Sequence, residues 1–547
     1  MYDLVLKNGK IVDGTGNPWY VADIGILDGK ISMIGVVPSE QGKSSIDAGG
    51  LVIAPGFIDI HSHADFVLPL ENHMDVLGCY LRQGITTLVT GNCGLSPAPV
   101  NPDNLELLKN YTGFLQSGDI GWNWNTMKEY LDKLEISGVG YNVVPLVSHG
   151  AIRIAVMGFD GSSPNPTQME KMRALVAQCM QEGAFGLSAG LIYAPGMFAS
   201  TKELIELTKP IIPYRGVFTC HVRGSSETGI EATKEIIEIA RANRIPVEHS
   251  HMEAYGENYW NHIDEQVRLH ESAREEGLDI TFDVIPYVAA NTTLTACFPP
   301  YAFEGGMDKF IERLTDTDQR EKIRYDVENM QSEWPTWLSG RWAHNLVRSG
   351  GWKNIWLIWV GGEKNSRFVG KSCEEIGKVQ GKDPFDAVAD LLIDEKGAAM
   401  AFYFGVSGDL EGDEGLKKLL AHPNGAINTD AILTGSGVPH PAAFGAFPRV
   451  LGQYVREEKI MSLEQAVRKM TSLSAQRFNI HDRGLIKQGM WADVTIFDEN
   501  KIRDNATYMV PDKIPSGIEY VLINGQLVLE RSKLDKNVRA GKVLRRH

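Results

Sequence analysis

The chain has 547 residues, of which 43% are hydrophobic and 22% charged, as in a globular enzyme larger than one ordinary domain. The formal net charge of -15 argues against binding to nucleic acid or to an anionic membrane surface. The sequence contains no apolar run of about 18 residues, and it starts without a signal-peptide pattern, so we expect a cytoplasmic protein. The six cysteines form no CxxC pairs and are expected to be reduced thiols.

The two ends of the chain have the same style of sequence. Residues 1–52 and 485–547 consist of short β-type runs around Asn-Gly or Asp-Gly pairs, the turn residues of tight hairpins. These pairs lie at Asn8–Gly9, Asp28–Gly29 and Asn524–Gly525. The arrangement suggests one small β-sandwich domain assembled from both ends, and two separate terminal hairpins are the alternative.

The middle of the chain, residues 53–484, alternates apolar β-type runs with helical stretches, which predicts a parallel (β/α)8 TIM barrel in the α/β class. Eight runs are strand candidates: 52–63, 86–93, 141–149, 184–193, 216–222, 245–252, 279–287 and 425–430. A ninth run near residue 400, AAMAFYFGV, either competes for a place in the barrel or belongs to an insertion. The stretch from about 288 to 397 is too long for a simple loop and predicts an inserted, lid-like segment.

Candidate metal ligands follow several of these strands. The run LVIAPGFIDIHSHADF carries His61 and His63, whose side chains share one face of a strand and could hold one metal ion, although a purely structural pair is the alternative. Four other strand ends carry further candidates: Cys93, His221 with Arg223, His249 with His251, and Asp430. Because catalytic residues of TIM barrels lie at the carboxyl ends of strands, the set predicts a metal site there.

The motif PGFIDxHxH resembles the first-strand signature of the amidohydrolase superfamily, metal-dependent hydrolases built on a TIM barrel. The segment KQGMWADVTIFD resembles the point at which chains of that superfamily re-enter a β domain built from both ends of the chain. Many hydrolytic members bridge two metals with a carboxylated lysine on strand four, but this chain reads EGAFGLSAGLIYAPG there. With GNCGLSPAP, HVRGSSETG and HPAAFGAFPRVLG, the pattern resembles the N-acyl-D-amino-acid deacylase (D-aminoacylase) family, which uses a cysteine at this place.

The resemblance implies a tight Zn²⁺ site, a weaker second site and a catalytic acid/base. The tight site would comprise Cys93, His221 and His251, and a weaker second site would use His61 and His63 through Cys93. The SH context favours His251 over His249 as the ligand. Asp430 would be the catalytic acid/base. Arg223, Tyr193 in GLIYAPG and Glu253 are our own candidates for binding substrate. Two features depart from the family: Glu253 stands where a basic residue is common, and INTDA replaces SDG around Asp430.

Amide hydrolysis explains why these residue types would be needed. A bound Zn²⁺ lowers the pKa of its water from 15.7 to about 7 and polarises the carbonyl. A carboxylate such as Asp430 can then carry the proton to the leaving amine. Tyr287 could donate to the developing oxyanion or could be a core tyrosine. The planar guanidinium of Arg223 suits a substrate carboxylate, and a salt bridge to a neighbouring loop is the alternative.

The sequence thus predicts zinc-dependent hydrolysis of N-acyl-D-amino acids or small D-residue peptides, with D-selectivity resting on the resemblance alone. A small molecule is the expected partner, and the oligomeric state, a homo-oligomer included, stays open. Another amidohydrolase, acting on a cyclic amide, imide or carbamoyl compound, is the second hypothesis, which the missing lysine disfavours. A binding protein that kept the fold is the third, but all predicted metal ligands are present.

Overall fold

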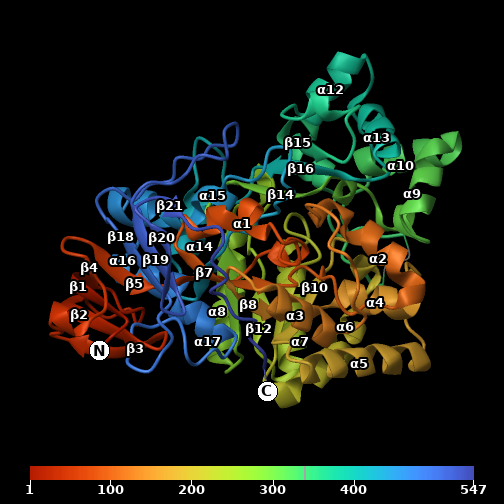
Figure 1. The fold of residues 1–547 in the computed structure, drawn as a ribbon. Coiled ribbons are helices and arrows are strands. Elements are labelled where there is room, and N and C mark those ends of the chain that lie inside the picture. Colours follow the sequence, from red (N-terminus) through yellow and green to blue (C-terminus); the bar gives the residue numbers. More distant parts are fainter. Residues whose placement is uncertain (338–339, 547) are drawn as a thin grey trace.

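The computed structural model describes residues 1–337 and 340–546, and its centre is a parallel (β/α)8 barrel (Figure 1). The barrel strands are β6 (Phe57–Asp59), β7 (Ile85–Thr90), β8 (Asn142–Pro145), β9 (Val147–Ser148), β10 (Gly186–Gly190), β11 (Val217–His221), β12 (Val247–His249), β13 (Ile280–Val284) and β17 (Gly425–Ile427). β8 pairs with β7, and β9 pairs with β10. Because only Leu146 separates β8 from β9, the two short strands together fill the third barrel position.

The barrel closes between its first and last strands. The Asp430 N–H donates to the His61 carbonyl oxygen at 3.0 Å. Thr429 donates from its N–H and its hydroxyl to the Asp59 carboxylate, at 3.0 and 2.6 Å. Each of the eight predicted runs therefore contains a barrel strand, and the predicted fold class is confirmed.

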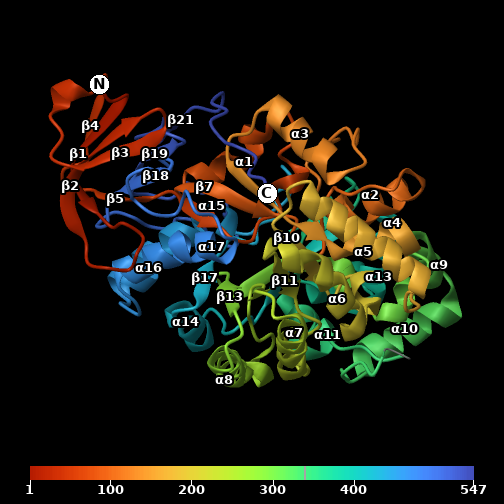
Figure 2. The ribbon, with the colours of Figure 1, turned by 90° about the horizontal axis from the view of Figure 1, so that it is seen from below.

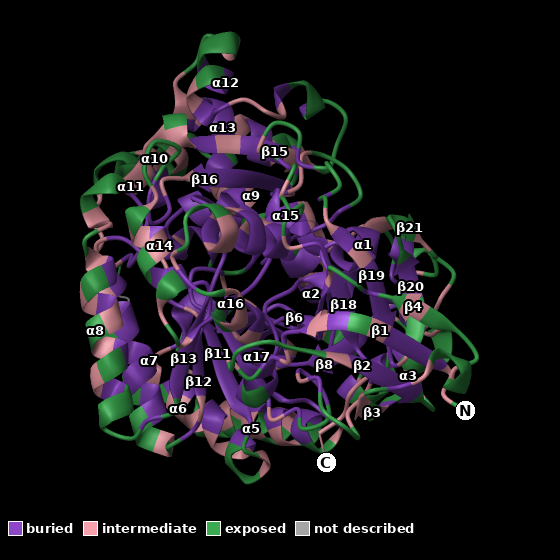
Figure 3. Ribbon diagram, turned by 90° about the vertical axis from the view of Figure 1, so that its left-hand side faces the viewer, coloured by how far each residue is buried: buried purple, intermediate pink, exposed green. Residues whose placement is uncertain are grey.

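Helices cover the outside of the barrel (Figure 2). The longest is α5 (Pro166–Gln181), which begins at a capping box between Asn165 and Gln168 with proline at its first position, a favourable start for a helix. The others around the barrel are α1 (His73–Leu81), α2 (Leu105–Thr112), α3 (Met127–Ser137), α4 (His149–Met157), α6 (Thr201–Thr208), α7 (Gly229–Asn243), α8 (His262–Glu275), α14 (Glu414–Ala421), α15 (Ala442–Arg449), α16 (Leu463–Met470) and α17 (Ser472–Arg477). Figure 3 shows exposed outer faces on helices such as α5 and α8, and buried strands inside. Within the described ranges, no helix is long and apolar enough to cross a membrane.

Strands from both ends of the chain lie in one nine-stranded sheet, whereas residues 541–546 leave it and bond to the barrel at Val143 and Gly183. Its strands are β1 (Leu4–Ile11), β2 (Tyr20–Leu27), β3 (Lys30–Gly35), β4 (Ser45–Asp47), β5 (Val52–Pro55), β18 (Val494–Phe497), β19 (Ile518–Ile523), β20 (Gln526–Glu530) and β21 (Lys533–Leu534). β5 joins the two ends, because it pairs with β1 on one side and with β18 on the other. Gly56 then leads directly from β5 into β6 of the barrel.

Two of the three predicted hairpin turns are present. Asp28–Gly29 connects β2 to β3, and Asn524–Gly525 connects β19 to β20. The prediction for Asn8–Gly9 is wrong, because β1 continues through this pair with a bulge in its pairing to β2. Asn8 has a φ of 57°, and its backbone N–H donates to the Asp23 carboxylate on β2. A side chain of the neighbouring strand therefore replaces the backbone partner that the bulge removes.

The ninth apolar run belongs to the inserted segment. It forms β16 (Ala399–Phe404), which lies between β14 (Ala289–Thr293) and β15 (Ile355–Val360) in an antiparallel sheet and extends past the expected boundary at 397. The helices of this region are α9 (Met307–Thr315), α10 (Thr317–Asn329), α11 (Leu346–Gly350), α12 (Cys373–Gln380) and α13 (Pro384–Asp394). In Figure 1 the segment stands above the barrel.

Candidate metal centre

The predicted metal ligands and the predicted acid/base meet at the carboxyl ends of the barrel strands. They lie at or just after β6, β7, β11, β12 and β17: His61, His63, Cys93, His221, His251 and Asp430. All are buried except His221, which is partly exposed. They form two groups that share Cys93, one with His221 and His251 and the other with His61, His63 and Asp430. In each group the atoms that could bind a metal lie within 4.8 Å of one another.

The distances around Cys93 fit a shared metal site. Its Sγ lies 3.7 Å from His251 Nε2, 3.8 Å from His221 Nδ1 and 3.1 Å from His61 Nε2. A tetrahedral zinc ion, with bonds of about 2.0 Å to nitrogen and about 2.3 Å to sulfur, places its ligand atoms roughly 3.5 Å apart. A thiolate with several imidazoles is also a donor set that zinc prefers. The residues present therefore fit the predicted metal.

Asp430 faces the two histidines of the second group. Its Oδ1 lies 3.2 Å from both His61 Nε2 and His63 Nε2. Burial opposes the ionisation of this carboxyl, but the positive charge of His61 and a hydrogen bond from His63 outweigh it and hold the pKa below its usual range. Asp430 is thus an ionised carboxylate at the centre of the cluster.

Unusual backbone holds three of these side chains in place. Cys93, His251 and Asp430 have φ values of 53°, 35° and 43°, in or near the left-handed region. Such a conformation costs on the order of 1–3 kcal/mol for a residue other than glycine and is typical of functional sites. Because each strand ends before these residues, the turn and not the strand alternation aims the side chain at the cluster.

The fourth strand supports the Cys93 turn and supplies no lysine. The Gly94 N–H donates to the Ser188 hydroxyl at 3.1 Å, and that hydroxyl donates to the Gly91 carbonyl. A Cβ on Gly190 would lie 2.0 Å from the Cys93 carbonyl oxygen, so only glycine allows the turn to come this close to β10. β10 therefore helps to position the cysteine.

Asp283 connects the two groups, although the sequence analysis did not single it out. One of its carboxylate oxygens accepts a hydrogen bond from the backbone N–H of His251 at 2.7 Å. The same oxygen lies 3.5 Å from the ring nitrogen Nδ1 of His61. Asn428 also donates to this oxygen. Carboxylates behind metal-binding histidines orient the imidazole rings. The available signal was the motif FDVIPY at the end of the seventh strand.

The structure places His251, and not His249, in the cluster. His249 is the last residue of β12, and its Nδ1 contacts His270 Nε2 at 3.1 Å behind the site. The two histidines would share a face only if the strand continued, but it ends at His249 and the left-handed backbone turns His251 toward Cys93.

Arg223 and Tyr287 have partners outside the cluster. The Arg223 guanidinium is buried, forms a 3.0 Å ion pair with Glu235, and donates to the carbonyls of Met197 and Ala199. The Tyr287 hydroxyl donates to the Asp504 carboxylate at 2.9 Å. The hydrogen bonds of both side chains thus go to neighbouring protein groups, as in the salt-bridge alternative for Arg223 and the core-tyrosine alternative for Tyr287.

Tyr193 and Glu253 both line a small inner cavity of about 30 Å³ beside His221, His251 and Asp430. The Tyr193 ring centroid lies 5.2 Å from that of His221, and its hydroxyl bonds Thr292 at 2.8 Å. Glu253 accepts a hydrogen bond from the Ser225 hydroxyl at 3.1 Å, and burial raises its pKa to about 8. These two predicted substrate-binding residues therefore lie beside the cluster.

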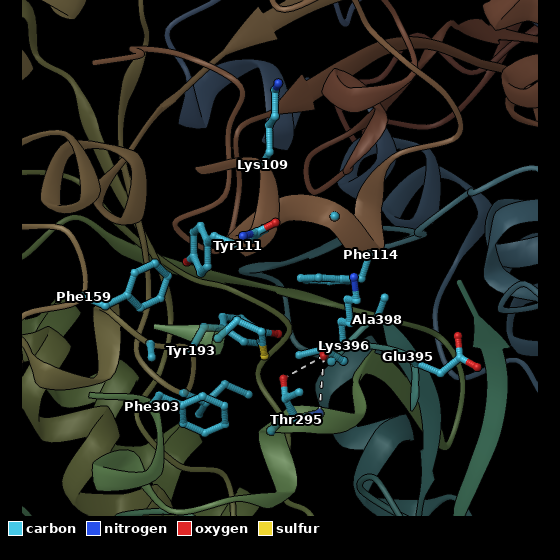
Figure 4. Close-up of a pocket in the computed structure, with 18 residues that line it drawn as sticks. Lys109, Tyr111, Phe114, Phe159, Tyr193, Thr295, Phe303, Glu395, Lys396 and Ala398 are labelled. Atoms are coloured by element: carbon cyan, nitrogen blue, oxygen red, sulfur yellow. Dashed lines mark hydrogen bonds between the residues drawn. The ribbon is translucent and has the colours of Figure 1, made fainter. Parts of the chain in front are cut away.

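A larger, mostly apolar cavity of about 310 Å³ adjoins the inner one and shares Ile192 and Tyr193 with it. Figure 4 shows Tyr111, Phe159, Tyr193 and Phe303 around this outer cavity. It offers space for an apolar group next to the cluster.

The inserted segment contributes further polar side chains to the inner cavity that the sequence analysis did not identify. Asn291 and His344 line it from this segment, and Tyr255 lines it from the loop after β12. All three are at least nine-tenths buried, and the Asn291 amide, both His344 ring nitrogens and the Tyr255 hydroxyl have no hydrogen-bond partner in the protein. No local motif marks Asn291 or His344, because they approach the barrel only through the fold of the insertion.

Comparison with known proteins agrees with this architecture. The Amidohydrolase family model matches residues 45–269 and 371–529. The chain is 30% identical to D-aminoacylase of Alcaligenes xylosoxydans xylosoxydans, over 100% of this chain and 98% of the relative. It is also 30% identical to N-acyl-D-glutamate deacylase of the same organism, over 100% and 96% of the two chains.

Solved structures superpose over the full length. One of D-aminoacylase, described as having a binuclear metal center, matches with a TM-score of 0.80 at 29% identity and covers 100% of both chains. N-acyl-D-glutamate deacylase from Bordetella bronchiseptica, complexed with zinc and a phosphonate inhibitor, matches with a TM-score of 0.81 at 29% identity, over 100% of this chain and 99% of that one. The chain is a metal-dependent amidohydrolase and belongs to the D-aminoacylase family of the amidohydrolase superfamily.

Proposed function

We propose that this protein is a zinc-dependent deacylase that hydrolyses the amide bond of N-acyl-D-amino acids or small D-residue peptides and amides. The observation that carries the proposal is the Cys93 cluster, with its sulfur 3.7 and 3.8 Å from the nitrogens of His251 and His221. The D-configuration of the substrate rests on the relatives named D-aminoacylase and N-acyl-D-glutamate deacylase.

In the proposed site, Cys93, His221 and His251 would hold the tight zinc ion, and His61 and His63 with Cys93 would hold a weaker second one. When bound, the metal supplies a Lewis acid for the scissile carbonyl and lowers the pKa of the attacking water. Ser188 and Asp283 keep the cysteine turn and His251 in position.

Asp430 is the proposed proton carrier. It is ionised and borders the inner cavity, so it can accept a proton from the attacking water and deliver it to the leaving nitrogen. Its backbone N–H is anchored to the His61 carbonyl, which fixes the carboxylate against the first strand. An amine leaves readily only after protonation, so this transfer is required for turnover.

The remaining predicted residues take different parts. Tyr193 separates the inner cavity from the outer one and is the proposed tyrosine beside the substrate. Arg223 is a positioning residue, because its ion pair with Glu235 and its bonds to Met197 and Ala199 tie β11 to the neighbouring loop. Tyr287 has a similar structural role, because its hydroxyl donates to the Asp504 carboxylate.

The test is a substrate panel on purified, zinc-loaded protein. N-acetylated D- and L-amino acids, their carboxamides, short D-residue peptides and hydantoins would be assayed for release of amine or ring opening. We expect hydrolysis of linear N-acyl-D compounds and no hydrolysis of hydantoins. Ring opening without hydrolysis of any linear amide would contradict the proposal and favour the cyclic-amide alternative.

A further inference from the structure

The inner cavity has an unusual distribution of charge for an enzyme that acts on N-acyl amino acids. A free amino acid product carries a carboxylate on the carbon next to the scissile nitrogen, so this carboxylate would lie close to the cluster. Among the described residues that line the inner cavity, none is lysine or arginine. The ionisable side chains there are Glu253, Asp430, two histidines of the cluster, His344 and tyrosines.

The nearest arginine cannot supply the missing charge. Arg223 borders a small neighbouring space with His344, but four of its N–H groups already donate to Glu235, Met197 and Ala199. Its charge is balanced by the buried Glu235 carboxylate at 3.0 Å. A substrate carboxylate beside Glu253 would therefore be buried without a cationic side chain, which is costly.

The groups that are available suit a different ligand. Glu253 uses one oxygen to accept from Ser225, and its side chain stays partly exposed to the cavity. Asn291 offers a free N–H₂ and a free carbonyl oxygen, and it is only 5% exposed. His344 is also 5% exposed and has both ring nitrogens unpaired. Buried polar groups without partners are rare in folded proteins and commonly await a ligand or ordered water.

We propose that this cavity selects substrates in which the group next to the scissile nitrogen is an uncharged carboxamide, as in N-acyl-D-aminoacyl amides or peptides, and not a free carboxylate. The carboxamide carbonyl would accept from Asn291, and its N–H would donate to Glu253. Neither protonation state of Glu253 provides positive charge, so the preference holds in both. The cavity of about 30 Å³ has room for roughly two water-sized groups, which is the size of one carboxamide.

This inference rests on the proposed deacylase function, and its first test compares two substrates that differ in one group. On zinc-loaded protein we expect kcat/KM for N-acetyl-D-leucinamide to exceed that for N-acetyl-D-leucine by tenfold or more. Glu253→Lys should reverse this preference, because it introduces a cation beside the substrate. The isosteric Glu253→Gln serves as the matched control and should keep the amide preferred. A wild-type preference for the free acid would overturn the inference and leave the deacylase function intact.

A binding measurement separates failure of the inference from failure of the function. In zinc-loaded Asp430→Asn protein, calorimetry should show tighter binding of the amide than of the acid, with the order reversed by added Glu253→Lys. Tighter binding of the acid would overturn the inference even if turnover is never observed. If Glu253→Lys does not fold, Asn291→Leu provides the second test, because it should weaken amide binding by fivefold or more and leave zinc content unchanged. Unchanged amide binding in folded Asn291→Leu protein would also overturn it.

Discussion

The barrel rim and the inserted segment face the same inner cavity, but they are built differently. Rim residues such as Cys93 and Asp430 are held by hydrogen bonds from their turns to other barrel strands and by left-handed backbone. Asn291 and His344 in the insertion come from separate parts of the chain and leave polar atoms unpaired. The backbone of the rim is thus fixed by the protein, whereas the insertion wall presents unpaired polar side chains to the cavity. We therefore assign the chemistry to the rim, and substrate selection to the wall together with Glu253 after β12.

Removal of the metal should have the largest effect on the function of the rim. Exhaustive chelation should abolish turnover, and zinc should restore it, because Cys93, His221 and His251 would otherwise surround no cation. Metal analysis of the purified protein should find about one tightly held zinc per chain and a weaker second site. Full activity in protein free of transition metals would contradict the assignment of the rim.

Cys93→Ala should have the next largest effect. Loss of the thiolate removes the ligand shared by both groups, so zinc content and turnover should fall together. Cys179→Ala in α5 is the matched control, because Cys179 is equally buried and belongs to neither group. The control should cost roughly 1 kcal/mol of stability and keep its zinc. If the two variants retained equal zinc, Cys93 would be only a core residue.

Asp430→Asn should separate catalysis from binding within the rim. The amide is nearly isosteric but cannot carry the proton, so kcat should fall by roughly 10² or more with little change in KM. Zinc content and melting temperature should stay close to those of the wild type. Loss of zinc along with activity would show that Asp430 is chiefly a ligand, and lost stability with normal turnover would make it a structural ion pair.

Arg223→Gln should change stability more than substrate preference. The variant leaves the Glu235 carboxylate buried without its ion pair, a change that costs roughly 3–5 kcal/mol. The additional change Glu235→Gln should recover part of the loss, as denaturant unfolding of the single and double variants would show. The ratio of kcat/KM for the acid and the amide should stay the same in folded protein. A selective loss of activity on the free acid would instead restore Arg223 as the carboxylate partner.

Tyr287→Phe should have the smallest effect. It removes one hydrogen bond to Asp504 and should lower the free energy of unfolding by about 1 kcal/mol. We expect kcat to change by less than about threefold, because this hydrogen bond involves neither the substrate nor the reacting atoms. A fall in kcat of two orders of magnitude, with stability unchanged, would identify Tyr287 as an oxyanion donor after all.

Local sequence pattern was sufficient for the barrel and most of the rim. Apolar runs that end in His61, Cys93 or His221 marked strands and ligands together, because in this fold the residue after a strand faces the site. Pattern failed where tertiary contacts decide the outcome. Asn8–Gly9 reads as a turn, but the strand continues through the pair as a bulge because it stays paired with β2 on both sides. His249 and His251 look equivalent until the end of β12 separates them.

The insertion wall was the least predictable part of the site. Asn291 follows β13 closely in sequence, whereas His344 comes after two further helices, and neither lies in a motif. Asn291 is placed by the pairing of β14 with β16, and the loop of His344 is held by a hydrogen bond from Thr228 to the Ala343 carbonyl, so both depend on contacts between residues far apart in the chain. The ion pair between Arg223 and Glu235 also could not be predicted without the fold.

The pairing of β5 with β18 also bears on how the protein is made. β5 leads through Gly56 into the strand that carries His61 and His63, yet its partner β18 begins only at Val494. On the ribosome, β18 emerges after the entire barrel has been synthesised. Until then one edge of β5 lacks its partner, and an unpaired strand edge is prone to association with other chains. The strand β6, by contrast, can pair with β7 soon after both have been synthesised.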